Sequence, residues 1–334
     1  MSIKGNKGFI NHGATCYLNS ALQCLSHIDI LSDNDFKNQI IKYKKNETPL
    51  LDEWLNIQNQ MWTDECNNSI NSSNLIQLFI EKCEDKNIYF ESFKQNDASE
   101  FLNIFLEFIH DEISRKIHIN IQGTVKNTLD KLYHNNLKIY EKHFKSNYSY
   151  IIENFYSSLL SLTQCPECNN TTDNHEPLSI ITLTLKSDYN SLYDCIDEYV
   201  KKISLDDDNK LKCEKCENYV NSSKKIVFWD LAPVLIVLLK KYNSENEIIS
   251  NKIQYPTKLD MNKYCLNYKE KSTEYELSGL IIHNGGINSG HYYSICKNTL
   301  ENQWKVYNDT QVFDIDENKL FNNHPYCLFY KRVQ

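Results

Sequence analysis

Cys16 and His291 are the two residues whose types and surroundings could together perform nucleophilic catalysis. Cys16 follows a glycine-containing loop that ends at Thr15, an acceptable N-cap residue. Apolar residues then recur at helical spacing at Leu18, Ala21, Leu22, Leu25 and Ile28. The sequence therefore predicts that Cys16 lies in the first turn of a buried helix, where backbone amides and the helix dipole favour a thiolate. An isolated cysteine is more often a small core residue, so catalysis also requires a base.

The base and a residue that orients it are both found near the end of the sequence. His291 begins an apolar, strand-like run, and the next such run ends at Asn308 and Asp309. Because side chains alternate along a strand, only one of these two residues can orient the imidazole directly, and the strand pattern alone does not say which. Asn11 could return on its loop to form an oxyanion hole with the backbone N–H of Cys16.

Four further cysteines form two Cys-x-x-Cys pairs with the spacing of metal-binding knuckles. These are Cys165 with Cys168, and Cys213 with Cys216. Two knuckles can supply the four thiolates of a structural zinc site. The pairs are too far apart for a compact zinc ribbon, so two hairpins must meet in space. A redox pair or disulfides are the alternatives, but neither a thioredoxin-like pattern nor a secretory context supports them.

The composition is that of a globular protein, with 41% hydrophobic and 24% charged residues among 334. A net charge of −8 disfavours nucleic acid as a partner and suits a cationic protein partner. No apolar run reaches the ~18 residues that a membrane span needs. The first six residues lack an apolar signal core, so we expect no membrane association and a cytoplasmic location, with the nucleus as the alternative.

The periodicity of apolar residues changes along the chain. Helical spacing predicts helices around residues 51–61, 75–79, 101–113, 124–146 and 192–200. Asp97 and Glu100 fit a capping box at the start of the third of these helices. From about residue 150 the pattern predicts strands, notably in 155–162, 178–185 and 224–242, with a turn at Ala232-Pro233. The sequence thus indicates an α+β protein with a helical first part.

Several of these segments together resemble the ubiquitin-specific proteases, a family of cysteine deubiquitinases. Residues 8–23 are similar to the cysteine box of the family, and residues 279–309 to its histidine box. The resemblance implies that Asn308 orients His291 and that Asp309 assists, and on this ground we select Asn308 as the third catalytic residue. Residues 95–102 resemble the motif Gln-Gln-Asp-Ala-x-Glu-Phe-Leu, with Asn96 in place of the second Gln. Ala14 and His12 depart from the family, which usually has asparagine and leucine at these positions.

The resemblance implies a papain-like cysteine peptidase fold with a helical thumb, zinc-stapled β fingers and a β-sheet palm. The whole chain, 1–334, would form a single catalytic domain, with the thumb in 1–148, the fingers mainly in 149–232 and the palm mainly in 233–334. Zn²⁺ held by the four cysteines would be structural. The implied reaction is thiol-dependent hydrolysis of the peptide or isopeptide bond that follows the C-terminal glycine of ubiquitin.

The resemblance also implies which residues contact ubiquitin. Gln95 and Asp97 would hold its extended basic tail, and Gly290 would let the narrow Gly-Gly end pass. His283 and Tyr292 are assigned to the same surface. The expected partners are ubiquitin and ubiquitinated proteins, bound by a monomer. Two other functions fit the sequence: a catalytically weak ubiquitin-binding scaffold, and a protease for another ubiquitin-like modifier.

Overall fold

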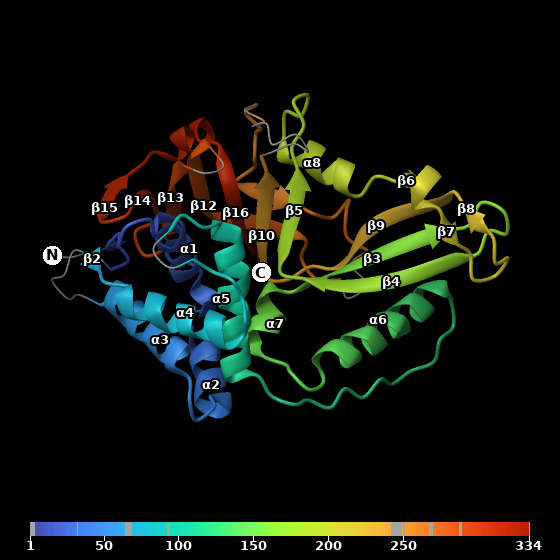
Figure 1. The fold of residues 1–334 in the computed structure, drawn as a ribbon, viewed down its shortest axis with the longest axis horizontal. Helices are drawn as coiled ribbons and strands as arrows, with labels where there is room; N and C mark the ends of the chain where they lie inside the picture. The colour runs from blue at the N-terminus through green and yellow to red at the C-terminus, as the bar shows by residue number, and fades with distance from the viewer. Residues whose placement is uncertain are drawn as a thin grey trace.

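The computed structural model describes residues 4–31, 33–63, 69–91, 94–241, 249, 251–266, 270–286 and 289–333. Helices from the first part of the chain pack against one side of a large sheet, and a second sheet extends away from it (Figure 1). Within the described ranges, no helix has the length and apolar composition that crossing a membrane would require.

In the described residues, five helices form the first lobe, and every helix predicted for this lobe is present. They are α1 (Cys16–Ser26), α2 (Asn34–Tyr43), α3 (Pro49–Trp62), α4 (Ser73–Asp85) and α5 (Ala98–Ile113). Every residue of α1 is buried, because this helix packs against α5 on one side and the large sheet on the other. Strands β1 (Gly8–Phe9) and β2 (Ser69–Ile70) pair beside it. The helix that begins at Cys16 is therefore the centre of the lobe.

The large sheet carries the C-terminal half of the chain. Its strand order is β15-β14-β13-β12-β16-β10-β5, and β11 also pairs with β12. The strands are β5 (Ile180–Thr184), β10 (Val234–Lys240), β11 (Lys258–Asp260), β12 (Glu274–Gly286), β13 (Ser289–Asn298), β14 (Gln303–Asn308), β15 (Gln311–Asp314) and β16 (Pro325–Arg332). One face packs on the helical lobe and the other on α8 (Leu192–Tyr199). The central strand β10 is thus covered on both faces, as its continuous apolar run predicted.

The second sheet has the order β4-β3-β9-β6 and projects from the body of the molecule (Figure 1). Its strands are β3 (Ser157–Gln164), β4 (Thr171–Leu178), β6 (Ile203–Leu205) and β9 (Ser222–Asp230), and a hairpin of β7 (Leu211–Lys212) and β8 (Tyr219–Val220) lies near its tip. Short 3-10 helices span Asp29–Leu31, Asp207–Asn209 and Glu317–Asn322. Helix α6 (Thr128–Phe144) packs along β4.

One expectation about this region is wrong. Strands were predicted from about residue 150, but residues Tyr150–Phe155 form a short helix, α7. The side chain of Ser149 accepts the N–H of Ile151 and so caps this helix. The segment is only six residues long and contains two adjacent isoleucines. Its apolar pattern therefore cannot distinguish a short helix from a strand.

Candidate active site

Cys16 is the first residue of α1, and its side chain is 4% exposed. Thr15 occupies the N-cap position, but its side chain makes no capping hydrogen bond. Instead its Oγ1 accepts the N–H of His12 at 3.0 Å, which closes the preceding loop. The prediction that Thr15 is the N-cap residue is therefore confirmed, although its side chain bonds to the preceding loop and not to the helix. Because this hydroxyl does not bond to the first turn of α1, the backbone amides of that turn remain available to the Cys16 sulfur and to ligands.

The Cys16 sulfur lies next to the strand that carries His291. Its Sγ accepts the backbone N–H of Tyr292, the residue after His291, at 3.5 Å. Burial raises the pKa of the Cys16 thiol, the amide of Tyr292 lowers it, and the charge of Asp309 raises it again. Burial has the largest influence, so the net pKa lies above the ordinary value. Desolvation thus outweighs the thiolate preference expected from the helix terminus alone.

His291 is bound to Asn308 across the paired strands β13 and β14. The imidazole Nε2 lies 2.5 Å from Oδ1 of Asn308. Because a carbonyl oxygen can only accept, Nε2 must carry the proton in this pair. The neutral ring then has its lone pair on Nδ1, the nitrogen available to act as a base.

Asp309 faces a different set of partners from its neighbour Asn308. Its Oδ2 accepts from Asn11 Nδ2 at 2.9 Å, and its Oδ1 accepts from Asn19 Nδ2 at 2.8 Å. The backbone of Asp309 adopts a positive φ of 51°, and its carbonyl accepts the N–H of Phe9. The carboxylate thus joins the β14–β15 turn to the loop before Cys16 and to α1.

Asn11 is held at both ends of its amide. While its Nδ2 donates to Asp309, its Oδ1 accepts from the N–H and from Oγ1 of Thr15, both at 3.3 Å. These contacts fix which end of the amide carries the donors. One N–H of Asn11 points to Asp309, and the second remains as a donor for a ligand.

Asn19 is a site residue that the sequence interpretation did not identify. It is 3% exposed and lies one helical turn after Cys16. Its Nδ2 also contacts the carbonyl of Ile10 at 3.3 Å. The available signal was a polar amide inside a helix expected to be buried, because buried amides need partners.

The segment before α5 is attached to the strand that carries His291. Gln95 makes two hydrogen bonds with the backbone of Gly290: Nε2 donates to the carbonyl at 2.9 Å, and Oε1 accepts the N–H at 3.2 Å. Asp97 caps α5 by accepting the N–H groups of Ser99 and Glu100, which is the Asp97 half of the predicted capping box. Its other oxygen accepts from the hydroxyl of Tyr326.

His283 and Tyr292 stack on each other beside these residues. Their ring centroids lie 4.2 Å apart, and the two residues face each other in the β12–β13 register. A Cβ at position 290 would come within 2.2 Å of Nε2 of His283. Gly290 is therefore required by the close approach of this ring. Burial, followed by the charge of Lys241, lowers the pKa of His283.

The four cysteines of the two Cys-x-x-Cys pairs meet near the tip of the projecting sheet. All four sulfurs lie within 4.8 Å of one another, with Cys165 3.8 Å from Cys216 and Cys168 3.6 Å from Cys213. A tetrahedral zinc ion with Zn–S bonds of about 2.3 Å has sulfur–sulfur edges of about 3.8 Å. The residues therefore fit this ion.

Matching backbone turns support both pairs. The N–H of Cys165 donates to the carbonyl of Asn170 and that of Cys213 to the carbonyl of Asn218, each at 2.9 Å. A positive φ follows each second cysteine, at Asn169 (55°) and Glu217 (58°). The prediction that two hairpins bring the cysteines together is confirmed.

The family model described as Ubiquitin carboxyl-terminal hydrolase matches residues 7–330. The chain belongs to this family. It is 27% identical over 341 residues to Ubiquitin carboxyl-terminal hydrolase Usp2 of Drosophila melanogaster, a match that covers 99% of this chain and 35% of that protein. It is 29% identical over 350 residues to Ubiquitin carboxyl-terminal hydrolase 8 of Saccharomyces cerevisiae, covering 98% of the chain and 70% of that protein. The chain thus spans about a third of the fly relative.

Solved structures of ubiquitin carboxyl-terminal hydrolases share the fold. The SAGA DUB module bound to monoubiquitin matches with a TM-score of 0.77 and 25% identity, over 99% of this chain and 70% of that chain. The SAGA Ubp8/Sgf11/Sus1/Sgf73 DUB module bound to ubiquitin aldehyde matches with a TM-score of 0.76 and 25% identity, over 100% and 71% of the respective chains. The predicted α+β fold of the ubiquitin-specific protease type is confirmed.

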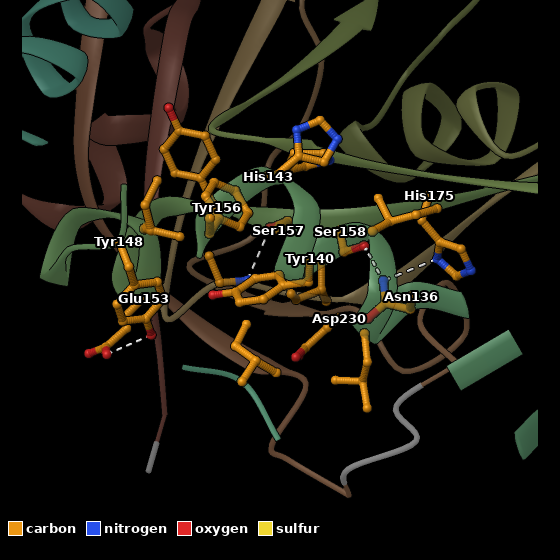
Figure 2. Close-up of a pocket in the computed structure, with 18 of the residues that line it drawn as sticks. Asn136, Tyr140, His143, Tyr148, Glu153, Tyr156, Ser157, Ser158, His175 and Asp230 are labelled. Carbon is orange, nitrogen blue, oxygen red and sulfur yellow. Dashed lines mark hydrogen bonds between the residues drawn. The ribbon is translucent and has the colours of Figure 1, made fainter. Parts of the chain in front are cut away.

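A separate cavity of about 440 Å³, which neither Cys16 nor His291 lines, lies between α6, α7 and the projecting sheet (Figure 2). Asn136 lines this cavity, and its side-chain Nδ2 donates to Oγ of Ser158 at 2.9 Å and contacts Nδ1 of His175 at 3.1 Å. None of the described residues that line it is a predicted site residue. The cavity therefore adds nothing to the candidate active site.

Proposed function

We propose that this chain hydrolyses the peptide or isopeptide bond after the C-terminal glycine of ubiquitin, with Cys16 as the nucleophile. The hydrogen bond from the Tyr292 amide to Cys16 Sγ carries the proposal, because it brings the sulfur to the backbone of the residue that directly follows His291. The family description names the hydrolase reaction. The titles of the structural neighbours describe complexes with monoubiquitin and ubiquitin aldehyde.

The first half of the reaction forms a thioester. Nδ1 of His291 accepts the Cys16 proton, and the thiolate attacks the carbonyl carbon of the terminal glycine. The free N–H of Asn11 and the backbone N–H of Cys16 stabilise the oxyanion. His291 then donates its proton to the leaving amine as the carbon–nitrogen bond breaks. In the second half, His291 deprotonates a water molecule that cleaves the thioester and regenerates the thiol.

Asn308 and Asp309 have separate roles in this mechanism. Asn308 orients the imidazole of His291 through its contact with Nε2. Asp309 holds the amide of Asn11 in position, with Asn19 bound to its other oxygen. Asp309 and Asn19 are thus positioning residues that act through Asn11.

We assign the tail of ubiquitin to the opening beside α5. Asp97 and Glu100 line a cleft of about 470 Å³ between α5, β5 and β10, and their carboxylates suit a basic, extended segment. Gln95, Gly290, His283 and Tyr292 extend this surface toward Cys16, as the resemblance implies.

We also propose that the four clustered cysteines hold one structural zinc ion. When bound, it would cross-link the ends of hairpins that bury little apolar surface of their own. The expected composition is one zinc ion per chain, measured by metal analysis of the purified protein.

Ubiquitin with a C-terminal fluorogenic amide tests the proposed activity directly. The chain is expected to release the fluorophore with multiple turnovers. Binding of ubiquitin without release would instead establish the scaffold function. Reaction with covalent probes of another ubiquitin-like protein, and not with the ubiquitin probe, would establish the alternative specificity.

Replacing Asp309 or Asn308 by alanine is expected to slow the reaction for different reasons. Asp309→Ala releases Asn11, and loss of an oxyanion donor costs about 10²–10³-fold in kcat. Because Asp309 raises the pKa of Cys16, this variant should also shift the pH profile of thiol alkylation to lower pH. Asn308→Ala should lower kcat about 10²-fold or more by releasing the imidazole.

The alkylation profile distinguishes the two roles. It should move in Asp309→Ala and stay closer to the wild-type profile in Asn308→Ala. An unchanged profile in Asp309→Ala would contradict the placement of this carboxylate beside the sulfur.

Replacing Asn19 by alanine is expected to destabilise the fold and slow catalysis together. The change leaves Oδ1 of Asp309 without its amide donor, which costs about 1–3 kcal/mol in the free energy of unfolding. Urea unfolding and kcat are the measurements. Ser20→Ala is the control, because Ser20 is the buried neighbour whose hydroxyl contacts only the carbonyl of Tyr17 among its described partners. If Asn19→Ala matched the control in kcat, Asn19 would have no positioning role.

A further inference from the structure

A cavity of about 240 Å³ lies beside the candidate active site, where β10 and β12 end. Its polar lining comes from Lys241, Asn251, His283, Asn284 and His324. The other lining residues are apolar or glycine, and none of the described residues that line the cavity is acidic. In a chain with a net charge of −8, a basic cavity without acidic residues is not a consequence of overall composition.

The ammonium group of Lys241 lacks a counterion among the described residues. Its Nζ donates to the backbone carbonyl of His324 at 3.0 Å, and no described carboxylate pairs with it. An ammonium group has three donors, and a buried charge is costly unless an opposite charge compensates it. Accordingly, burial lowers the pKa of Lys241 to about 8.

The titratable groups that line the cavity with Lys241 are basic, and the nearest acidic influence comes from Asp97, which does not line the cavity but whose charge raises the pKa of His283 and of Cys327. Burial and the charge of Lys241 lower the pKa of both His283 and His324, and Lys252 lowers that of His324 further. The pKa of the fully buried thiol of Cys327 is raised by its burial, which keeps it neutral. The cavity therefore presents one positive charge at neutral pH, carried by Lys241.

Asn251 adds an unused acceptor to the same lining. Its Nδ2 donates to the carbonyl of Tyr189 at 2.7 Å, while its buried Oδ1 has no hydrogen-bond partner among the described residues. A ligand that satisfies both groups needs a negatively charged oxygen for Lys241 and an N–H donor for Asn251.

We infer that this cavity binds a carboxylate carried by a polypeptide, such as an acidic side chain with its neighbouring backbone N–H. The apolar wall of Leu185, Leu239 and Pro325 suits the methylene groups of such a side chain. One ammonium group matches one negative charge and not a phosphate dianion. Because His283 lines the cavity and stacks on Tyr292, the bound segment would lie next to Cys16.

Direct binding measurements test the inference without any assumption about catalysis. N-acetyl-glutamate amide is titrated against the wild-type chain by NMR, with N-acetyl-glutamine amide as the uncharged analogue. Saturable binding of the glutamate compound alone is expected. Its affinity should fall about tenfold per pH unit above pH 8, because only the ammonium form of Lys241 binds. Equal binding of both compounds, or binding of neither, would overturn the inference.

Two further ligands test whether the cavity prefers a polypeptide carboxylate to a small carboxylate or a phosphate. Acetate has the carboxylate without the N–H, and inorganic phosphate has more charge without the methylene groups. Weaker binding of both supports the polypeptide assignment. Acetate binding as tight as that of the glutamate compound would identify a site for small carboxylates, and tighter phosphate binding would identify a phosphate site. Either result would overturn the assignment.

Variants then locate the site. Lys241→Met keeps the aliphatic stem and is expected to weaken binding about tenfold or more, the effect of one charge-assisted hydrogen bond. Lys258→Met, at a lysine whose side chain is 82% exposed, is the control and should bind normally. Wild-type affinity in Lys241→Met would place the ligand elsewhere.

The chain also carries two carboxylates just after Lys241, at Glu245 and Glu247, outside the described residues. The double variant Glu245→Gln, Glu247→Gln should bind the glutamate compound as the wild type does. Much tighter binding would mean that the chain supplies its own carboxylate, which would contradict an external ligand.

Discussion

Replacing Cys16 by serine is expected to reduce hydrolysis of fluorogenic ubiquitin amide by about 10⁴-fold or more. The sulfur is the only protein group in the proposed mechanism that bonds to the substrate carbon. A serine hydroxyl is far less acidic than a thiol, and the neutral imidazole of His291 would have to remove its proton with no further base. The measurement is kcat/KM for fluorophore release, together with the Kd for ubiquitin.

The Kd for ubiquitin shows whether the loss of activity comes from the chemical step or from weaker binding. Ubiquitin binding should be close to that of the wild type, because the hydroxyl is smaller than the thiol and α1 keeps its packing. Cys265→Ser is the matched control, since Cys265 is a half-buried cysteine whose sulfur contacts the carbonyl of Trp229, away from the catalytic residues. Retained turnover in Cys16→Ser would refute the nucleophile assignment.

Replacing Cys213 by serine is expected to release the metal and unfold the tip of the projecting sheet. Structural zinc contributes about 10–16 kcal/mol of apparent binding free energy in small zinc domains, and this energy stabilises the folded state. Within the described part of the chain, the apolar cluster around the cysteines includes one buried residue besides them, Val220, so the hairpins have little other stabilisation. Metal content and protease sensitivity of residues 165–220 are the measurements.

A strong chelator should reproduce this effect on the wild-type chain. The control is Glu214→Gln, an exposed residue within the same Cys-x-x-Cys knuckle. Fluorophore release from a small thioester should persist after chelation, because the cysteines are remote from Cys16. Full metal content in Cys213→Ser, or an unchanged cleavage pattern, would show that these residues do not form the site.

The elements that carry several of the candidate site residues could be predicted because their signals are local. The apolar spacing behind Cys16, the cap at Asp97 and the paired cysteines are each confined to a few residues. The contacts among Asn11, Asn19 and Asp309 could not be predicted in the same way. They join positions separated by 298 and 290 residues, so no local pattern indicates which amide meets which oxygen.

The choice between Asn308 and Asp309 shows the same limit. Strand alternation indicated that only one of them could face His291, and Asn308 is the residue in contact with it. The role of Asp309 could not be predicted in this way, because it depends on the backbone conformation at that residue. Asp309 lies beyond the end of β14 with a positive φ, and this turn aims its carboxylate at the loop before α1. Helix α7 was not predicted, because a short segment with β-branched side chains fits more than one local structure.

Because α1 is completely buried, Cys16 cannot move independently of the core around it. A helix enclosed by a sheet and a helical lobe cannot detach alone, so its amide protons should exchange with deuterium only through cooperative unfolding of the whole body. Gln95, at the exposed rim, can break and re-form its contacts on a faster timescale. The sulfur would thus stay fixed while the entrance rearranges around an arriving protein.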